Sequence, residues 1–185
     1  MLRFRPTLYA LCFLLLAAAQ PTCAQKADAT TVVIVIRHAE KASDQGSDPS
    51  LTENGTKRAQ ALIDVVGDAT VSAIYSSQFK RTQDTVAPLA EHLDVPVTTM
   101  EVSGANLSTY PQELADDILQ NHRGETVVVV NHSNTVPQIV GALGGTEIPE
   151  ISEEEYNDVF IVIIPADAPA RTIRAQYGIG LSLHH

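Results

Sequence analysis

The sequence is poor in cysteine and in positive charge. Its two cysteines, Cys12 and Cys23, both lie within the first 23 of its 185 residues. The rest of the chain therefore has neither disulfides nor a thiol for catalysis. Lysine and arginine together number 12 against 22 aspartates and glutamates, so the formal net charge is −10. A surface of this sign repels nucleic acid and anionic lipid over most of its area, and neither is an expected partner.

The sequence also lacks an apolar run long enough to cross a membrane, which takes about 20 residues. Its longest apolar stretch, residues 8–19, follows two arginines and precedes the small and polar residues QPTCAQ. This layout is typical of a secretory signal peptide. We predict a signal peptide over residues 1–24, cleaved after Ala24, and an exported protein, periplasmic or secreted, with no stable membrane insertion. A retained membrane anchor, or a lipid attached at Cys23, is the alternative.

Residues 25–185 contain no repeat, low-complexity tract or interdomain linker, and their length suits one domain. Short apolar runs rich in β-branched residues and bounded by turn signals predict strands. They are Thr31–Ile36, Val71–Tyr75, Val95–Thr99, Thr126–Val130 and Val159–Ile164. The fourth has no polar alternation, which fits a strand covered on both faces.

Apolar residues with helical spacing lie between these strands. Residues 59–66, 86–93 and 136–143 each follow the i, i+3, i+4, i+7 pattern, and a weaker helix begins near Pro111. Strands that alternate with helices predict an α/β fold, a doubly wound and mostly parallel sheet with helices on both faces. A sixth strand, Thr172–Tyr177, follows a link too short for a crossover helix, so an antiparallel hairpin is expected at or near one edge. The acidic segment 147–156 is expected to be a solvated surface loop, with cation or partner binding as the alternative.

Positively charged side chains and histidines follow the predicted strands. The first strand ends in Arg37 and His38, the second leads to Arg81, and the fourth is followed by His132. Because the loops after parallel strands share one edge of a doubly wound sheet, we expect these side chains to converge. Ten cationic residues remain beyond residue 24, and four of them cluster in two short segments: Arg37, Lys41, Lys80 and Arg81. The sequence therefore predicts one anion site on an acidic protein.

Phosphate suits such a site. Two guanidinium groups match phosphoryl oxygens and stay protonated, and the helix opened by Ser133, Asn134 and Thr135 adds backbone N–H groups. A neutral histidine is then free to attack phosphorus, while the arginines and the second histidine neutralise charge on the transferred group. Alternatively, the two histidines could bind a metal with Glu40 or Asp44, although nearby arginines would oppose the cation.

Four motifs resemble the histidine phosphatase superfamily, the phosphoglycerate-mutase-like proteins, in its short form. They are RHAEKA, LTENGTKRAQAL, YSSQFKRTQDTVAPLA and VVVVNHSNTVP, and they occur in the family's order across nearly all of residues 25–185. The resemblance implies a histidine phosphatase-like domain without metal or cofactor. It also implies that His38 becomes phosphohistidine and that Arg37, Arg81 and His132 complete the phosphate pocket. The implied activity is hydrolysis of phosphate monoesters, or of phosphohistidine, in a small molecule or a phosphoprotein.

The chain departs from the family's pattern at two places. Ala39 stands where the family has glycine, a change of one methyl group that we expect to be tolerated. The family's larger members also supply a proton-donating carboxylate from an insertion that is short here. Glu101 is the best candidate for that acid, with Asp44 and Asp48 behind it.

The short form resembles the family's small members, which implies phosphohistidine or other substrates with good leaving groups. Because a large cap is missing, we expect a shallow, open pocket and broad or protein-sized substrates. The short chain also disfavours a mutase, which must keep water away from its phosphorylated intermediate. The alternative to an enzyme is a noncatalytic protein that binds phosphate ligands in the same pocket.

Overall fold

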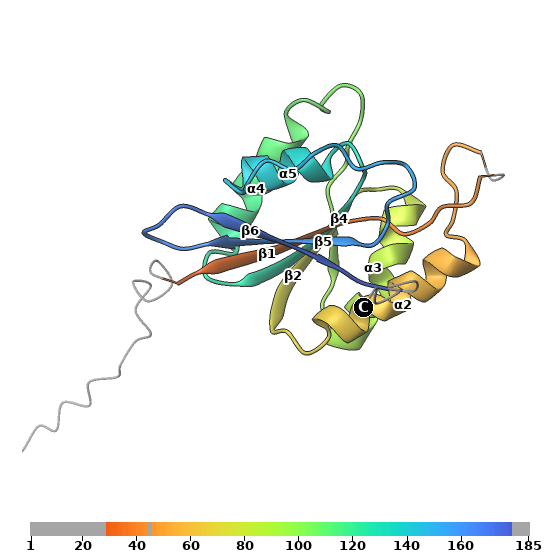
Figure 1. Ribbon diagram of the computed structural model, residues 1–185, viewed down its shortest axis with the longest axis horizontal. Coiled ribbons are helices and arrows are strands. Elements are labelled where there is room, and N and C mark those ends of the chain that lie inside the picture. Colours follow the sequence, from red (N-terminus) through yellow and green to blue (C-terminus); the bar gives the residue numbers. More distant parts are fainter. Residues whose placement is uncertain (1–28, 44–45, 179–185) are drawn as a thin grey trace, which may run out of the picture.

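The computed structural model describes residues 29–43 and 46–178, so the predicted signal peptide and its cleavage site lie outside the described residues. The strands are β1 (Thr31–Arg37), β2 (Val71–Ser76), β3 (Val97–Thr99), β4 (Thr126–Asn131), β5 (Asp158–Ile164) and β6 (Arg171–Gln176). The helices are α2 (Glu53–Val66), α3 (Lys80–Leu93), α4 (Tyr110–Asn121) and α5 (Val136–Ala142). Figure 1 shows one central sheet with helices packed against it.

The strands form a single sheet in the order β3-β2-β4-β1-β5-β6. The pairs β3–β2, β2–β4 and β4–β1 are parallel, whereas β5 runs antiparallel to β1 and β6 runs antiparallel to β5. The predicted α/β fold, with a mostly parallel sheet and an antiparallel hairpin at one edge, is confirmed. Strand β3 is shorter than predicted, because pairing with β2 begins only at Val97.

Both faces of the sheet are covered, as the apolar run in β4 predicted. Val127 and Val129 point to the face packed by α4 and α5, and Val128 and Val130 point to the face packed by α2 and α3. All four side chains are fully buried. In Figure 1, α4 and α5 lie above the sheet and α2 lies below it. This arrangement leaves the strand ends, rather than the faces, free to build a site.

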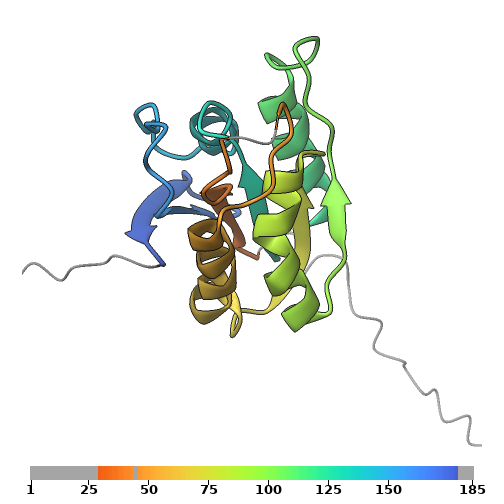
Figure 2. The ribbon, with the colours of Figure 1, turned by 90° about the vertical axis from the view of Figure 1, so that its right-hand side faces the viewer.

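The loops that follow the parallel strands gather at one end of the sheet. Figure 2 shows the chain after β1, the chain after β3 and the chain before β5 rising together at the top of the view, the end toward which β3 points. These loops include residues 38–43, 101–109 and 145–157. In doubly wound sheets, ligands bind in the crevice between the loops at this end of the strands.

Gly55 allows α2 to approach the chain that follows β1. A Cβ atom on Gly55 would lie 2.3 Å from the backbone oxygen of Glu40 and 3.1 Å from Cβ of Leu51. We predict that Gly55→Ala lowers the free energy of unfolding by about 1–3 kcal/mol, because the clash outweighs alanine's better helix propensity. Urea denaturation measures this loss. Gly141→Ala in α5 is the matched control, since a Cβ there meets no atom within 4 Å. Equal stability of the two variants would contradict the prediction.

Candidate active site

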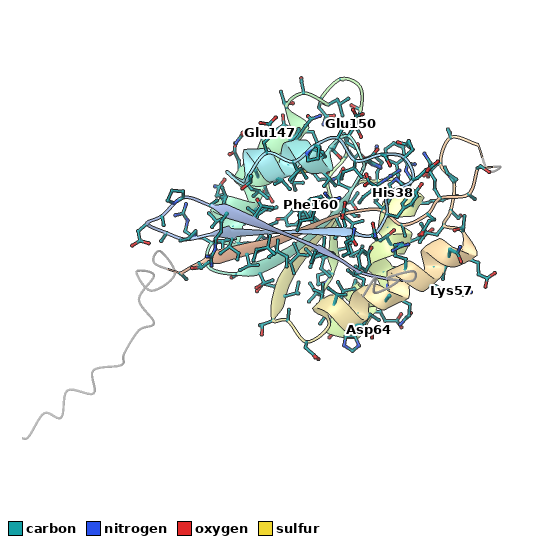
Figure 3. The ribbon with its side chains drawn as sticks, in the orientation of Figure 1. His38, Lys57, Asp64, Glu147, Glu150 and Phe160 are labelled. Carbon is teal, nitrogen blue, oxygen red and sulfur yellow. The ribbon has the colours of Figure 1, made fainter. Side chains whose placement is uncertain are left out.

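Adjacent parallel strands place the two candidate histidines side by side. Arg37 in β1 pairs with Asn131 in β4, and His38 and His132 follow directly. The backbone N–H of His38 donates to the Asn131 carbonyl oxygen at 2.8 Å. The two imidazole ring centroids lie 5.5 Å apart. Figure 3 shows His38 at the end of the sheet opposite the turn that joins β5 and β6.

The hydrogen bond made by His38 defines which ring nitrogen is free. Its Nδ1 atom lies 2.7 Å from the carbonyl oxygen of Ala39, which can only accept, so Nδ1 carries the proton and Nε2 keeps its lone pair. Burial, and to a smaller extent the charges of Arg37 and Arg81, lower the pKa of His38 to about 3. The ring is therefore neutral at pH 7. A neutral imidazole with a free Nε2 is the nucleophilic form.

His132 is held through a chain of hydroxyl groups. Its Nε2 atom lies 2.9 Å from Oγ of Ser77, which in turn lies 2.8 Å from Oγ1 of Thr82. Burial, followed by the charge of Arg81, lowers the pKa of His132 to about 3. Its Nδ1 atom is buried without a hydrogen-bond partner. Ser77 was not predicted as a site residue, although it lies in the motif YSSQFKRTQDTVAPLA.

Arg37 is fixed by the acidic segment 147–156. Its Nη1 atom donates to the carbonyl oxygens of Ser152 at 2.6 Å and Glu155 at 3.0 Å, and its guanidinium carbon lies 4.1 Å from the centre of the Tyr156 ring. The segment is the largely exposed surface loop that was expected, and it contacts Arg37 as well. Backbone carbonyls of an irregular loop bind the arginine, and no periodicity in the sequence could indicate that contact.

Buried polar atoms without hydrogen-bond partners gather at this end of the sheet. Within residues 29–43 and 46–178, four buried side-chain polar atoms lack a hydrogen-bond partner: Arg37 Nε, Arg81 Nε, His132 Nδ1 and Tyr177 Oη. Three of the four belong to the residues predicted to bind phosphate. Buried polar groups without partners are rare in folded proteins, and a cluster of nitrogens at one place is suited to an oxyanion.

These side chains line one cavity of about 340 Å³. The predicted residues in its lining are Arg37, His38, Arg81, His132, Ser133 and Asn134, and Lys41 is present as well. The large apolar side chains in the lining are Phe79, Val102 and Leu107. The structure therefore brings together every predicted phosphate-binding residue, in a lining that also contains apolar side chains. Lys80 is exposed and does not line the cavity.

Two of the three candidate proton donors, Glu101 and Asp48, lie outside the cavity lining. Glu101 is exposed and precedes the lining residue Val102. The Oδ1 atom of Asp48 accepts the backbone N–H of Lys80 at 3.0 Å and lies 3.7 Å from Nη1 of Arg81. Asp44 is outside the described residues. The carboxylate found in the described lining is instead Glu153, which the sequence reasoning missed.

Glu40, a candidate ligand in the metal-binding alternative, is paired with an arginine. Both carboxylate oxygens of Glu40 accept hydrogen bonds from Arg58, at distances of 2.7–3.0 Å. In the part of the chain that the structure describes, no group of three histidine, cysteine, aspartate or glutamate residues is placed to hold a metal ion. The Glu40–Arg58 pair instead anchors the segment after His38 to α2.

Two polar residues shape the turns that carry the histidines. Oγ1 of Thr85 accepts the backbone N–H of Ala39 at 2.9 Å. Oδ1 of Asn131 accepts hydrogen bonds from Oγ1 of Thr135 at 2.6 Å and from the backbone N–H of His132 at 3.2 Å. Ala39 is fully buried and its φ is not positive, so alanine is accommodated where the family has glycine.

The buried neutral histidines make stability dependent on pH. Both have a pKa of about 3 in the folded protein and about 6.5 when exposed, so the unfolded chain binds more protons below pH 6.5. Stability therefore falls as the pH decreases from 6.5, by up to about 1.4 kcal/mol per pH unit for each histidine. Between pH 6.5 and 4.5, we expect the free energy of unfolding to fall by about 2 kcal/mol less in His132→Asn than in wild type. Urea unfolding at the two pH values measures this difference, and identical losses would contradict the assignment of a neutral His132.

The fold and the site together define the class of protein: a doubly wound α/β protein with a cavity lined by two neutral histidines and two arginines. The sequence profile of the histidine phosphatase superfamily (branch 1) matches residues 33–102, which include His38 and Arg81. Over these residues the chain is similar to the histidine phosphatase superfamily. No curated protein matches the chain in sequence.

Solved structures of three phosphatases share the fold. A mycobacterial glucosyl-3-phosphoglycerate phosphatase is 15% identical, with 82% of this chain and 100% of that chain covered and a TM-score of 0.58. The protein histidine phosphatase SixA, complexed with tungstate, is 18% identical, with 78% and 96% covered and a TM-score of 0.56. Phosphoserine phosphatase from Entamoeba histolytica, in complex with 3-phosphoglyceric acid, is 17% identical, with 82% and 98% covered and a TM-score of 0.58.

Proposed function

We propose that the protein is a metal-independent phosphatase that works through a covalent phosphohistidine on His38. The observation that carries the proposal is the neutral His38 ring in a cavity lined by three residues with unpartnered buried nitrogens, Arg37, Arg81 and His132. In the first step, Nε2 of His38 forms a bond to phosphorus and the leaving group departs with the electron pair of its own bond. In the second step, water attacks the phosphohistidine, inorganic phosphate leaves, and the ring is regenerated. Arg37, Arg81 and His132 stabilise the charge on the transferred group in both steps.

The cavity favours substrates whose leaving group departs without a proton. Glu153 is the carboxylate in the described lining, and its hydrogen bond with Ser133, together with Arg37 and Lys41, keeps its pKa below the usual value. It therefore stays ionised and cannot donate. Phosphohistidine and aryl phosphates meet this requirement, in a small molecule or a phosphoprotein, and the apolar side chains in the lining suit a ring. The structurally similar SixA is a protein histidine phosphatase, which supports the first of these substrates.

We further propose that the protein acts after export. The charge and apolar patterns of residues 1–24 support a signal peptide that directs it to the periplasm or the medium. None of the helices in the described residues is both long and apolar enough to cross a membrane.

The deciding experiment measures inorganic phosphate released from an aryl phosphate by the purified protein, with and without a metal chelator. We expect release that the chelator does not change and that His38→Asn removes. A protein that is stabilised against heat by phosphate, yet hydrolyses neither aryl phosphates nor phosphohistidine, would instead be a noncatalytic phosphate-binding protein.

A further inference from the structure

Glu153 places a negative charge on the positively charged side of the cavity. Its Oε2 atom lies 3.3 Å from Nη2 of Arg37 and 3.6 Å from Nζ of Lys41, and its Oε1 atom accepts the hydroxyl of Ser133 at 3.1 Å. All three partners line the cavity. A carboxylate that bridges two cations and a hydroxyl makes the same kinds of contact as a phosphoryl group.

The groups that Glu153 contacts are those that a substrate would need. Nη1 of Arg37 is committed to two backbone carbonyls, so only Nη2 and the unpartnered Nε remain for a phosphoryl group. Glu153 already accepts from Nη2. A phosphoryl group that binds Nε and Nη2 of Arg37 must therefore displace the carboxylate or use the second N–H of Nη2 beside it.

The side chain of Glu153 can be displaced without moving the rest of the site. It is 70% exposed, whereas the side chain of Arg37 is only 3% exposed. Arg37 remains held by the carbonyl oxygens of Ser152 and Glu155 and by the ring of Tyr156 when the carboxylate swings into solvent. Displacement therefore has an energetic cost but leaves the phosphate-binding geometry intact.

We infer that Glu153 is a specificity-determining residue, an internal carboxylate that competes with the phosphoryl group for Arg37, Lys41 and Ser133. The inference rests on the proposed function, because it takes this cavity as the phosphate site. Glu153 raises the Kd of oxyanions and the KM of substrates, so that only ligands able to use the whole donor set bind well. It takes no part in bond making or proton transfer.

The test compares wild type with Glu153→Gln and with Glu154→Gln. The Glu154 variant is the matched control. Glu154 is the next residue along the chain, its side chain is exposed and does not line the cavity, and the substitution removes the same charge. Calorimetry with inorganic phosphate gives Kd, and hydrolysis of an aryl phosphate gives KM and kcat. We expect Glu153→Gln to lower both Kd and KM by roughly 3- to 10-fold, the effect of one partly exposed charged contact, with kcat changed less than about 2-fold. Glu154→Gln should stay within about 2-fold of wild type in all three values.

Each other result has a distinct meaning. Phosphate binding that is unchanged or weaker in Glu153→Gln overturns the inference and leaves the proposed function standing. A large fall in kcat with unchanged KM also overturns it, because Glu153 would then act in catalysis. If phosphate binds neither wild type nor the variants, the cavity is not a phosphate site, and the inference and the proposed function fail together.

Discussion

We expect the His38→Asn variant to lose phosphate release by about 10⁴-fold or more, the largest effect of any single substitution in this protein. Asparagine can keep the hydrogen bond to the Ala39 carbonyl that Nδ1 of His38 makes, but it has no nucleophilic Nε2. The variant therefore removes the attacking atom while it preserves the local fold. The first step then has no covalent route, and the measurement is inorganic phosphate released per minute under saturating aryl phosphate.

Binding should survive this substitution. Arg37, Arg81 and His132 still present their unpartnered nitrogens, so phosphate should stabilise His38→Asn against heat about as much as it stabilises wild type. Wild type quenched during turnover should carry an acid-labile phosphoryl group on His38, and the variant should carry none. His92→Asn is the control, because His92 is exposed in the last turn of α3 and should keep full activity. Turnover at the wild-type level in His38→Asn would exclude the covalent mechanism.

The sequence could predict the site residues that lie at the C-terminal ends of the parallel strands. Arg37, His38 and His132 follow two apolar runs, and parallel pairing of such runs brings their C-terminal ends to one edge. Arg81 could be predicted for a related reason, since it lies in the first turn of the helix that follows β2. Lys80 shows the limit of this reasoning, because adjacent residues on a helix point about 100° apart and only one of the two faces the cavity.

The missed contributions come from side chains and loops without periodicity. The composition of the acidic segment 147–156 predicts a surface loop. In the structure, its carbonyl oxygens also accept hydrogen bonds from Arg37, and Glu153 lines the cavity. Irregular loops take their path from long-range contacts, which composition does not encode. Glu101 failed to reach the lining for the same reason: its distance from the pocket depends on the path of the loop between β3 and α4. A buried hydroxyl such as Ser77 is likewise indicated only by its place in a motif.

The second large effect is a steep dependence of rate on the leaving group. The described lining holds no carboxyl group that is free to donate a proton, because contacts with Ser133, Arg37 and Lys41 keep Glu153 ionised. A positioned general acid is typically worth about 10²–10⁴ in rate, so we expect kcat/KM to fall by about that factor from an aryl phosphate with a leaving-group pKa near 7 to an alkyl phosphate of similar size. The value of kcat/KM is the right quantity, since it reports phosphoryl transfer to His38 and not the later hydrolysis of phosphohistidine.

A series of substituted phenyl phosphates measures this dependence without changing the fit to the apolar side chains of the lining. The logarithm of kcat/KM should decrease steadily as the pKa of the departing phenol rises. A flat plot would show that a proton is donated as the leaving group departs, and the structure indicates where to look for the donor: Glu101 and Asp48 lie near the cavity but outside its lining. The Glu101→Gln and Asp48→Asn variants would then identify the donor, because only loss of the group that donates the proton makes the plot steep. A steep wild-type plot that neither substitution alters would assign the chemistry to His38 and the three phosphate-binding side chains, with selectivity for leaving groups that depart as stable anions.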